Sequence, residues 1–162
     1  MPTPGPGVAE ADPGVAAAMD RALALAEMCV PDGDVPVGAV VLGPDGAVLG
    51  EGRNRREAAG DATAHAEVEA LRAAAGGLGQ GWRLPGATVV VTLEPCVMCT
   101  GALVAARVRR TVFGAWDDKA GACGSVWDLA RDPLSLHRLE VVGGVRGEES
   151  AAMLRDFFST RR

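Results

Sequence analysis

Three residues in two short segments are of types that bind zinc. His65 stands in the first segment, and Cys96 and Cys99 stand in the second, further along the chain. A structural zinc site is closed by four protein ligands, whereas a catalytic site uses three and leaves the fourth position to water. One histidine and two cysteines are one ligand short of a closed site, so the pattern predicts one catalytic zinc ion per chain.

A carboxylate close to the histidine could transfer protons during a reaction at the metal. Zinc lowers the pKa of a bound water from about 15.7 toward about 7, and a carboxylate can then take a proton and return it to a leaving group. Glu67 lies near enough to His65 in the sequence to reach over the metal. We expect Glu67 to be the catalytic proton carrier and not a ligand.

The cysteine pair on its own also fits other chemistry. A Cys-x-x-Cys segment can be a redox pair or half of a structural zinc knuckle. A knuckle would need two more ligands, which His137 with Cys29 or Cys123 would have to supply. Free cysteines often behave as small buried hydrophobic residues, and we expect that role for Cys29 and Cys123.

Composition limits the class of protein. The chain has 162 residues, 48% of them hydrophobic and 23% charged, which suits one globular domain. Its net charge of -5 has the wrong sign for binding nucleic acid by overall charge, so RNA contact would depend on a local basic patch. Four cysteines and no secretory signal favour a reducing compartment, and we expect a cytoplasmic protein without membrane contact.

The apolar pattern predicts the elements that hold these residues. Residues 1–14 are rich in proline and glycine and predict a disordered tail, followed by one zinc-dependent domain over residues 15–162. Thr63 is a candidate N-cap for the helix that begins at His65. We expect helices over residues 15–29, 65–75, 96–106 and 148–161, a short helical piece over 127–130, and strands over 36–42, 47–52, 87–92, 110–114 and 139–145.

These elements predict an α/β fold. Strands that alternate with helices after an opening hairpin indicate a three-layer α-β-α sandwich around a five-stranded mixed sheet. The third and fourth strands are joined by a helix, so they should be parallel. The zinc ligands lie at two helix starts, where the positive end of the helix favours the thiolate. Both starts should converge at one edge of the sheet.

The motifs resemble one enzyme family across residues 15–162. The pattern His-x-Glu followed by Pro-Cys-x-x-Cys is typical of zinc-dependent nucleobase deaminases. The flanking segments, with the zinc motifs, resemble bacterial tRNA-specific adenosine deaminases, which have a cytidine deaminase-like fold. The segments that carry the resemblance are residues 35–39, 50–52, 54–55, 63–67, 91–99, 112–115 and 156–158.

The resemblance implies hydrolytic deamination of adenosine to inosine at the wobble position of a tRNA anticodon, in particular an arginine tRNA with anticodon ACG. It implies that Asn54 hydrogen-bonds the flipped base, that the Ala66 backbone reads the base edge, and that Val37 packs on the ring. It also implies that Asp117 contacts the neighbouring ribose-phosphate and that Phe158, on the terminal helix, contacts RNA.

Two other functions stay open, and so does the assembly. A deaminase of a free base or nucleoside such as guanine would share the zinc motif, and a non-catalytic protein with structural zinc would need a fourth protein ligand. The family relatives are homodimers, and residues 98–103 contain small side chains that suit close helix packing across a two-fold axis. We therefore expect a homodimer that binds a tRNA anticodon stem-loop.

Overall fold

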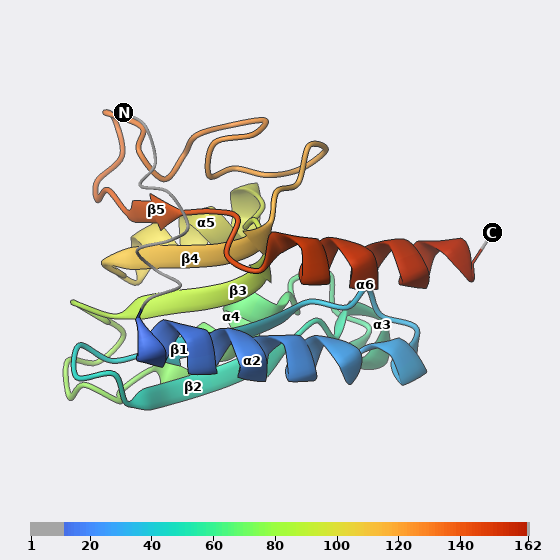
Figure 1. Cartoon of the computed structure of the whole chain (residues 1–162). Coiled ribbons are helices and arrows are strands. Elements are labelled where there is room, and N and C mark those ends of the chain that lie inside the picture. Colours follow the sequence, from blue (N-terminus) through green and yellow to red (C-terminus); the bar gives the residue numbers. More distant parts are fainter. Residues whose placement is uncertain (1–11, 162) are drawn as a thin grey trace.

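A five-stranded mixed sheet forms the centre of the computed structural model, which describes residues 12–161 (Figure 1). Its strands lie in the order β2-β1-β3-β4-β5. Their bounds are β1 (Gly38–Leu42), β2 (Val48–Arg53), β3 (Thr88–Leu93), β4 (Arg110–Ala115) and β5 (Glu140–Val142). The helices are α2 (Pro13–Glu27), the short 3-10 helix η1 (Val30–Asp32), α3 (Arg56–Ala59), α4 (Ala66–Ala74), α5 (Val97–Ala105) and α6 (Gly147–Ser159).

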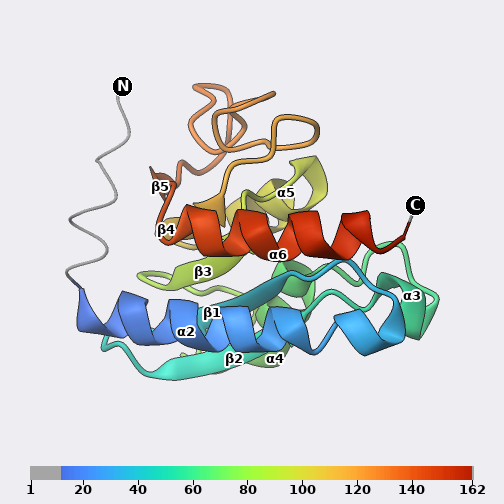
Figure 2. The ribbon, with the colours of Figure 1, turned by 45° about the vertical axis from the view of Figure 1, so that its right-hand side comes forward.

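Helices cover both faces of this sheet. Figure 2 shows α2 and α6 side by side on one face, and α4 and α5 pack on the other. β1 pairs antiparallel with β2 and β3, whereas β3 pairs parallel with β4 and β4 with β5. The three-layer α-β-α sandwich is confirmed, and so is the parallel pairing of the two strands that flank α5.

Side chains of the central strands alternate between the two faces of the sheet, so the buried residues form one hydrophobic cluster on each face. Successive side chains of a strand point to opposite faces of the sheet. Val41 of β1 and Val89 of β3 therefore pack in the cluster that contains the α4 alanines, while Val40 and Val90 pack against α2. All four valines are fully buried, which is why both strands read as continuous apolar runs. Within residues 12–161, none of the helices is both long and apolar enough to cross a membrane.

Three local predictions differ from the structure. Helix α2 begins at Pro13, inside the predicted tail, because Asp12 caps it through the amides of Gly14 and Val15; the rest of that tail, residues 1–11, lies outside the described residues. Thr63 is not an N-cap, since its hydroxyl donates to Asp61 at 2.8 Å, and the cap position of α4 is His65.

The predicted helical piece over residues 127–130 is also wrong. That segment folds back on the preceding loop instead of coiling on itself. Cys123 and Asp128 form an isolated antiparallel bridge, and the amide of Leu129 donates to the carbonyl of Ala122 at 2.9 Å. Because those backbone groups are used in the bridge, they cannot form helical hydrogen bonds.

Candidate active site

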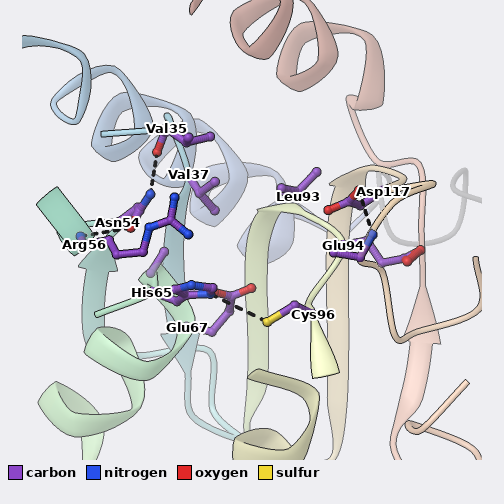
Figure 3. Close-up of a pocket in the computed structure, with 12 residues that line it drawn as sticks. Val35, Val37, Asn54, Arg56, His65, Glu67, Leu93, Glu94, Cys96 and Asp117 are labelled. Atoms are coloured by element: carbon purple, nitrogen blue, oxygen red, sulfur yellow. Dashed lines mark hydrogen bonds between the residues drawn. The ribbon is translucent and has the colours of Figure 1, made fainter. Parts of the chain in front are cut away.

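The ends of two helices bring the predicted zinc ligands together. His65 is the N-cap residue of α4, and Cys96 is the N-cap residue of α5, with Cys99 in the first turn of that helix. Figure 3 shows His65 and Cys96 pointing toward one another at the floor of a pocket. The N-terminal ends of both helices carry partial positive charge, which favours thiolate ligands at this position.

The close packing of α4 on the sheet fixes His65. Ala66, Ala70 and Ala74 recur every fourth residue and form the fully buried stripe of α4. This stripe lies on two glycines of β2, and a Cβ atom at Gly50 would lie 2.6 Å from the Ala70 carbonyl oxygen. A Cβ atom at Gly52 would lie 2.4 Å from the Ala66 oxygen. Only glycine at these two positions lets the helix approach so closely.

The spacing of the ligand atoms fits a tetrahedral zinc ion. His65 Nδ1 lies 3.6 Å from Cys96 Sγ and 3.5 Å from Cys99 Sγ. Zn–N bonds of about 2.0 Å and Zn–S bonds of about 2.3 Å at a tetrahedral angle place nitrogen and sulfur about 3.5 Å apart. All three ligand atoms lie within 4.8 Å of one another. The donor set and its geometry therefore match one zinc ion.

The described chain offers this cluster three ligands and not four. Within residues 12–161, the group of metal-binding side chains contains His65, Cys96 and Cys99 and no other histidine or cysteine. His137 Nε2 lies 2.6 Å from the Val108 carbonyl oxygen, and Cys29 and Cys123 are buried elsewhere in the core. The two additional ligands that a zinc knuckle would require are thus not brought to the site.

Hydrogen bonds and burial shift the pKa values of the two cysteine thiols in opposite directions. Contacts with Cys99 and with His65 lower the pKa of Cys96 to about 4, so Cys96 is a thiolate at neutral pH. The same contact with Cys96, together with burial, raises the pKa of Cys99. A metal that binds both sulfurs must therefore displace the proton of Cys99.

Glu67 stands beside this cluster and is almost fully buried. Its Oε2 atom accepts a hydrogen bond from Cys99 Sγ at 3.3 Å. Burial raises the pKa of the Glu67 carboxyl. A carboxyl group with a raised pKa, next to a metal site and open to a pocket, is suited to accepting and releasing a proton near neutral pH.

The pocket above the ligands contains four of the five residues predicted to bind substrate. Val37, Asn54, Ala66 and Asp117 all line it, together with Glu67 (Figure 3). Asn54 is held from both sides of its amide, because Nδ2 donates to the Val35 carbonyl at 3.0 Å and Oδ1 accepts from the Arg56 amide at 3.2 Å. One amide hydrogen and one lone pair of Asn54 remain for a ligand.

Phe158 is not brought to this pocket. The pocket lining does not include it, and its ring lies on α6, half exposed, in an edge-to-face contact with the ring of Phe157. Phe157 is the ring that packs into the core, where Arg161 stacks on it at 3.8 Å from the ring centroid.

Sequence reasoning missed other residues of the pocket wall. Arg56 is one of them, and it is the first residue of the short helix α3, which the apolar pattern did not indicate. The rest of the wall comes from positions whose place depends on tertiary contacts: Val35, Leu93, Glu94 and Ala120.

Comparison with known proteins agrees with this geometry. Residues 15–115 match the family model of the cytidine and deoxycytidylate deaminase zinc-binding region. The tRNA-specific adenosine deaminase of Haemophilus influenzae is 45% identical over 144 residues, which is 89% of this chain and 83% of that protein. A solved structure from a study of A-to-I editing by tRNA:A34 deaminases at the wobble position has a TM-score of 0.80 and 42% identity, covering 86% of this chain and 99% of that one.

Another relative is much longer than this chain. The tRNA(Ile)-lysidine synthase of Deinococcus deserti is 52% identical over 145 residues, which is 90% of this chain but 27% of that protein. This chain therefore spans about a quarter of the length of that relative.

Proposed function

Since this chain belongs to the cytidine and deoxycytidylate deaminase zinc-binding family, and to the tRNA-specific adenosine deaminases, we propose that it converts adenosine to inosine by hydrolysis at the wobble position of a tRNA anticodon. One observation is the main support for the proposal. A single pocket is lined by metal-binding residues, by the buried carboxylate of Glu67 and by the fixed amide of Asn54. That combination provides for a water nucleophile, a proton carrier and a base contact in one place.

The metal site is assigned to His65, Cys96 and Cys99 because their donor atoms have the right types and spacing. When bound there, zinc lowers the pKa of a water molecule and so supplies a nucleophile at neutral pH. The three side chains would hold the metal at the pocket floor, from helices that pack on the sheet. With three protein ligands, a zinc ion there would keep one position for water.

Glu67 carries the proton in this mechanism. Its Oε2 accepts from the Cys99 thiol, a contact that would end if Cys99 held zinc as a thiolate. Oε2 can then take a proton from the nucleophile and pass it to the nitrogen that leaves C6 as ammonia. The nearly complete burial of Glu67 keeps bulk water from competing for that proton.

The remaining wall of the pocket orients the base. Asn54 has one donor and one acceptor site left for the edge of a purine, and the Ala66 backbone at the start of α4 faces the same space. Val37 offers an apolar surface to the ring. These contacts are few, so they favour a nucleotide that has already left its stack, as in an unpaired loop.

Affinity for RNA must come from residues around the base. We assign Asp117 to the neighbouring ribose-phosphate and Phe158 to a more distant RNA contact on α6. Arg56, at the pocket wall, adds a positive charge for a phosphate. Binding should weaken as salt rises, because phosphate contacts release counterions. The resemblance favours an arginine tRNA with anticodon ACG as the substrate.

The same proposal includes the assembly and the location. Helix α5 is apolar on almost every side, and its outer residues Val97 and Gly101 are exposed. A helix that is apolar all round is normally covered, and a second copy of this chain would cover it in a homodimer. A tRNA substrate and four free thiols suit the cytoplasm.

A deamination assay that separates each substrate from its product tests the proposal. An anticodon stem-loop with adenosine at the wobble position should be deaminated far faster than free adenosine, cytidine or guanine at equal concentration. Rapid deamination of guanine without any reaction of the stem-loop would assign the protein to the free-base deaminases. No deamination of any substrate by zinc-loaded protein would leave only the structural-zinc hypothesis.

A further inference from the structure

Residues 117–125, which we call the pocket loop, follow β4 and form one wall of the pocket. Two loop residues, Asp117 and Ala120, line the pocket. The Asp117 carboxylate accepts from the amides of Lys119 at 3.0 Å and Ala120 at 3.2 Å, so the start of the loop is a rigid turn. The wall therefore keeps its place only if the loop as a whole stays against the segment that carries Cys96.

Two backbone contacts hold the loop against that segment. The amide of Ala122 donates to the Pro95 carbonyl at 2.8 Å, and Gly121 forms an isolated antiparallel bridge with Cys96. The loop is thus added to the metal-binding segment like a short extra strand. Such a bridge has few hydrogen bonds and would open easily without a further contact.

The Glu94 side chain supplies that further contact. Its Oε2 is hydrogen-bonded to the Ser125 hydroxyl, which also lies 2.6 Å from the carbonyl oxygen of Asp117. Ser125 is the last residue of the loop and Asp117 the first. The Glu94 carboxylate therefore accepts the single hydroxyl proton of Ser125 at one end of the loop, and the Asp117 carbonyl at the other end lies against the same hydroxyl.

The loop backbone is shaped to accept this carboxylate. A Cβ atom at Gly121 would lie 1.5 Å from Glu94 Oε2 and 2.3 Å from Ser125 Oγ, so glycine is required for the close approach. Glu94 itself is 2% exposed, and among the described residues its Oε1 has no hydrogen-bond partner. The loop backbone is therefore closed around the buried Glu94 side chain.

We propose that Glu94 is a positioning residue, whose buried carboxylate holds the pocket loop in place so that Asp117 and Ala120 form the substrate-facing wall. Among the described residues, the Glu94 side chain has no hydrogen bond to the side chains of His65, Cys96 or Cys99, which lie at the starts of α4 and α5. Loss of its carboxylate should therefore change the binding of substrate more than the chemical step. The expected effect on RNA binding rests on the proposed function, whereas the expected effect on the position of the loop does not.

Hydrogen exchange and kinetics on the zinc-loaded protein test the role of Glu94. In Glu94→Ala, the amides of Gly121 and Ala122 should exchange about tenfold faster, as expected for the loss of one hydrogen bond. KM for the stem-loop should rise by a similar factor while kcat changes little. Glu94→Gln should restore both values, because its amide can donate to Ser125 Oγ and leave the hydroxyl proton for the Asp117 carbonyl.

Two further variants change the loop residues that contact Glu94. Ser125→Ala and Gly121→Ala should each reproduce the faster exchange and the higher KM. Ser135→Ala is the matched control, since the Ser135 hydroxyl also donates to a loop carbonyl, that of His137 at 2.8 Å, but lies outside the pocket lining. It should leave exchange in the pocket loop and KM unchanged.

Several results would overturn the proposal. Unchanged exchange at Gly121 and Ala122 in both Glu94→Ala and Ser125→Ala would show that the carboxylate does not hold the loop. Faster exchange with an unchanged KM would show that the loop does not serve substrate. If Glu94→Ala does not fold, Ser125→Ala decides alone. A wild-type protein that fails to deaminate the stem-loop would contradict the proposed function, but the exchange data would still decide the position of the loop.

Discussion

A substitution of Glu67 can separate the chemical step from the binding of zinc and RNA. Glu67→Gln keeps the size of the side chain but removes its ability to take up and return a proton. We expect kcat to fall by about 10²- to 10⁴-fold, the usual contribution of a general acid or base, while zinc content and stem-loop affinity stay near wild type. Steady-state kinetics with metal analysis measure both.

The neighbouring carboxylate provides the control for this substitution. Glu69 lies on the same helix, pairs with Arg72 at 3.3 Å and is absent from the pocket lining. Glu69→Gln should retain normal turnover. Near-normal turnover in Glu67→Gln would remove Glu67 from the mechanism.

The four thiols should differ sharply in reactivity once the metal is removed. The thiolate is the reactive form of cysteine, so a thiol reacts well only when the pH is above its pKa. Cys96, with a pKa lowered to about 4, is ionised even at pH 6. Burial raises the pKa of Cys123 to about 12 and also raises that of Cys29, so both stay protonated at pH 6 and at pH 8.

Alkylation followed by mass spectrometry measures this difference. In chelator-treated protein at pH 6, Cys96 should be modified first, and zinc should protect it. Cys29 and Cys123 should stay unmodified until the chain unfolds. Modification of Cys123 as rapid as that of Cys96 would contradict the electrostatics described for the site.

The proposed zinc ligands could be predicted from their types and spacing, whereas part of the pocket wall could not. His65, Cys96 and Cys99 could be predicted because zinc ligands are few in type and their spacing is set by one helical turn. Glu94 stands directly before Pro95, inside the same motif, yet nothing in its sequence position indicates Ser125 as a partner. That contact depends on how a distant loop folds back.

At the scale of elements, the glycines of β2 hold α4 in place. Gly52→Ala would put a methyl carbon 2.4 Å from the Ala66 oxygen and 2.5 Å from the Ala70 nitrogen, which are backbone atoms that cannot move without the helix. We expect a loss of about 1–3 kcal/mol in the free energy of unfolding, as for other overpacked cores. Because the displaced turn carries His65, zinc affinity should fall as well.

A second glycine-to-alanine change controls for the substitution itself. Gly14 lies in α2, and the nearest atom to an added Cβ there is Asp12 Oδ1 at 3.3 Å. Gly14→Ala should keep the melting temperature and zinc affinity of the wild type. Thermal unfolding and zinc titration of both variants test the prediction. Equal stability of the two variants would show that α4 does not depend on close contact with β2.

Helix and strand positions were predictable where the apolar pattern was long. Helices α4 and α5 begin within one residue of the predicted starts, because each follows a buried strand or loop with a clear apolar repeat. The piece over residues 127–130 was predicted as a helix and is not one, since its backbone pairs with the pocket loop. Short segments are decided by such tertiary contacts, which local pattern does not encode.

At the scale of the whole molecule, the outer side of α5 predicts the assembly. Val97 is 44% exposed, and Gly101 is exposed with no atom within 4 Å of an added Cβ. We expect the wild-type protein to be a dimer in light scattering at micromolar concentration. Gly101→Arg should give a monomer with normal zinc content, because a charge there opposes helix packing across a two-fold axis.

Ala73→Arg is the matched control, since Ala73 is exposed on α4 and lies outside the predicted interface. It should remain dimeric. A wild-type protein that is monomeric and fully active would contradict the predicted assembly.

The order of the strands in the sheet could be predicted only in part from the sequence. The parallel pairing of β3 and β4 followed from the helix between them, but the antiparallel pairing of β1 with β3 places the opening hairpin beside a strand that is distant in sequence. This pairing brings Asn54, at the end of β2, within the same pocket as Cys96. Net charge was equally uninformative, since -5 for the chain hides arginines such as Arg56 at the pocket wall.

We propose that this zinc site deaminates one adenosine of an anticodon loop, and nucleoside mapping of a reacted stem-loop tests this proposal most directly. The RNA should carry an adenosine at the wobble position and a second unpaired adenosine elsewhere in the loop. After single-turnover reaction with zinc-loaded protein, inosine should be found at the wobble position alone, and chelated protein should produce none. Inosine at both positions, or at neither, would contradict the account.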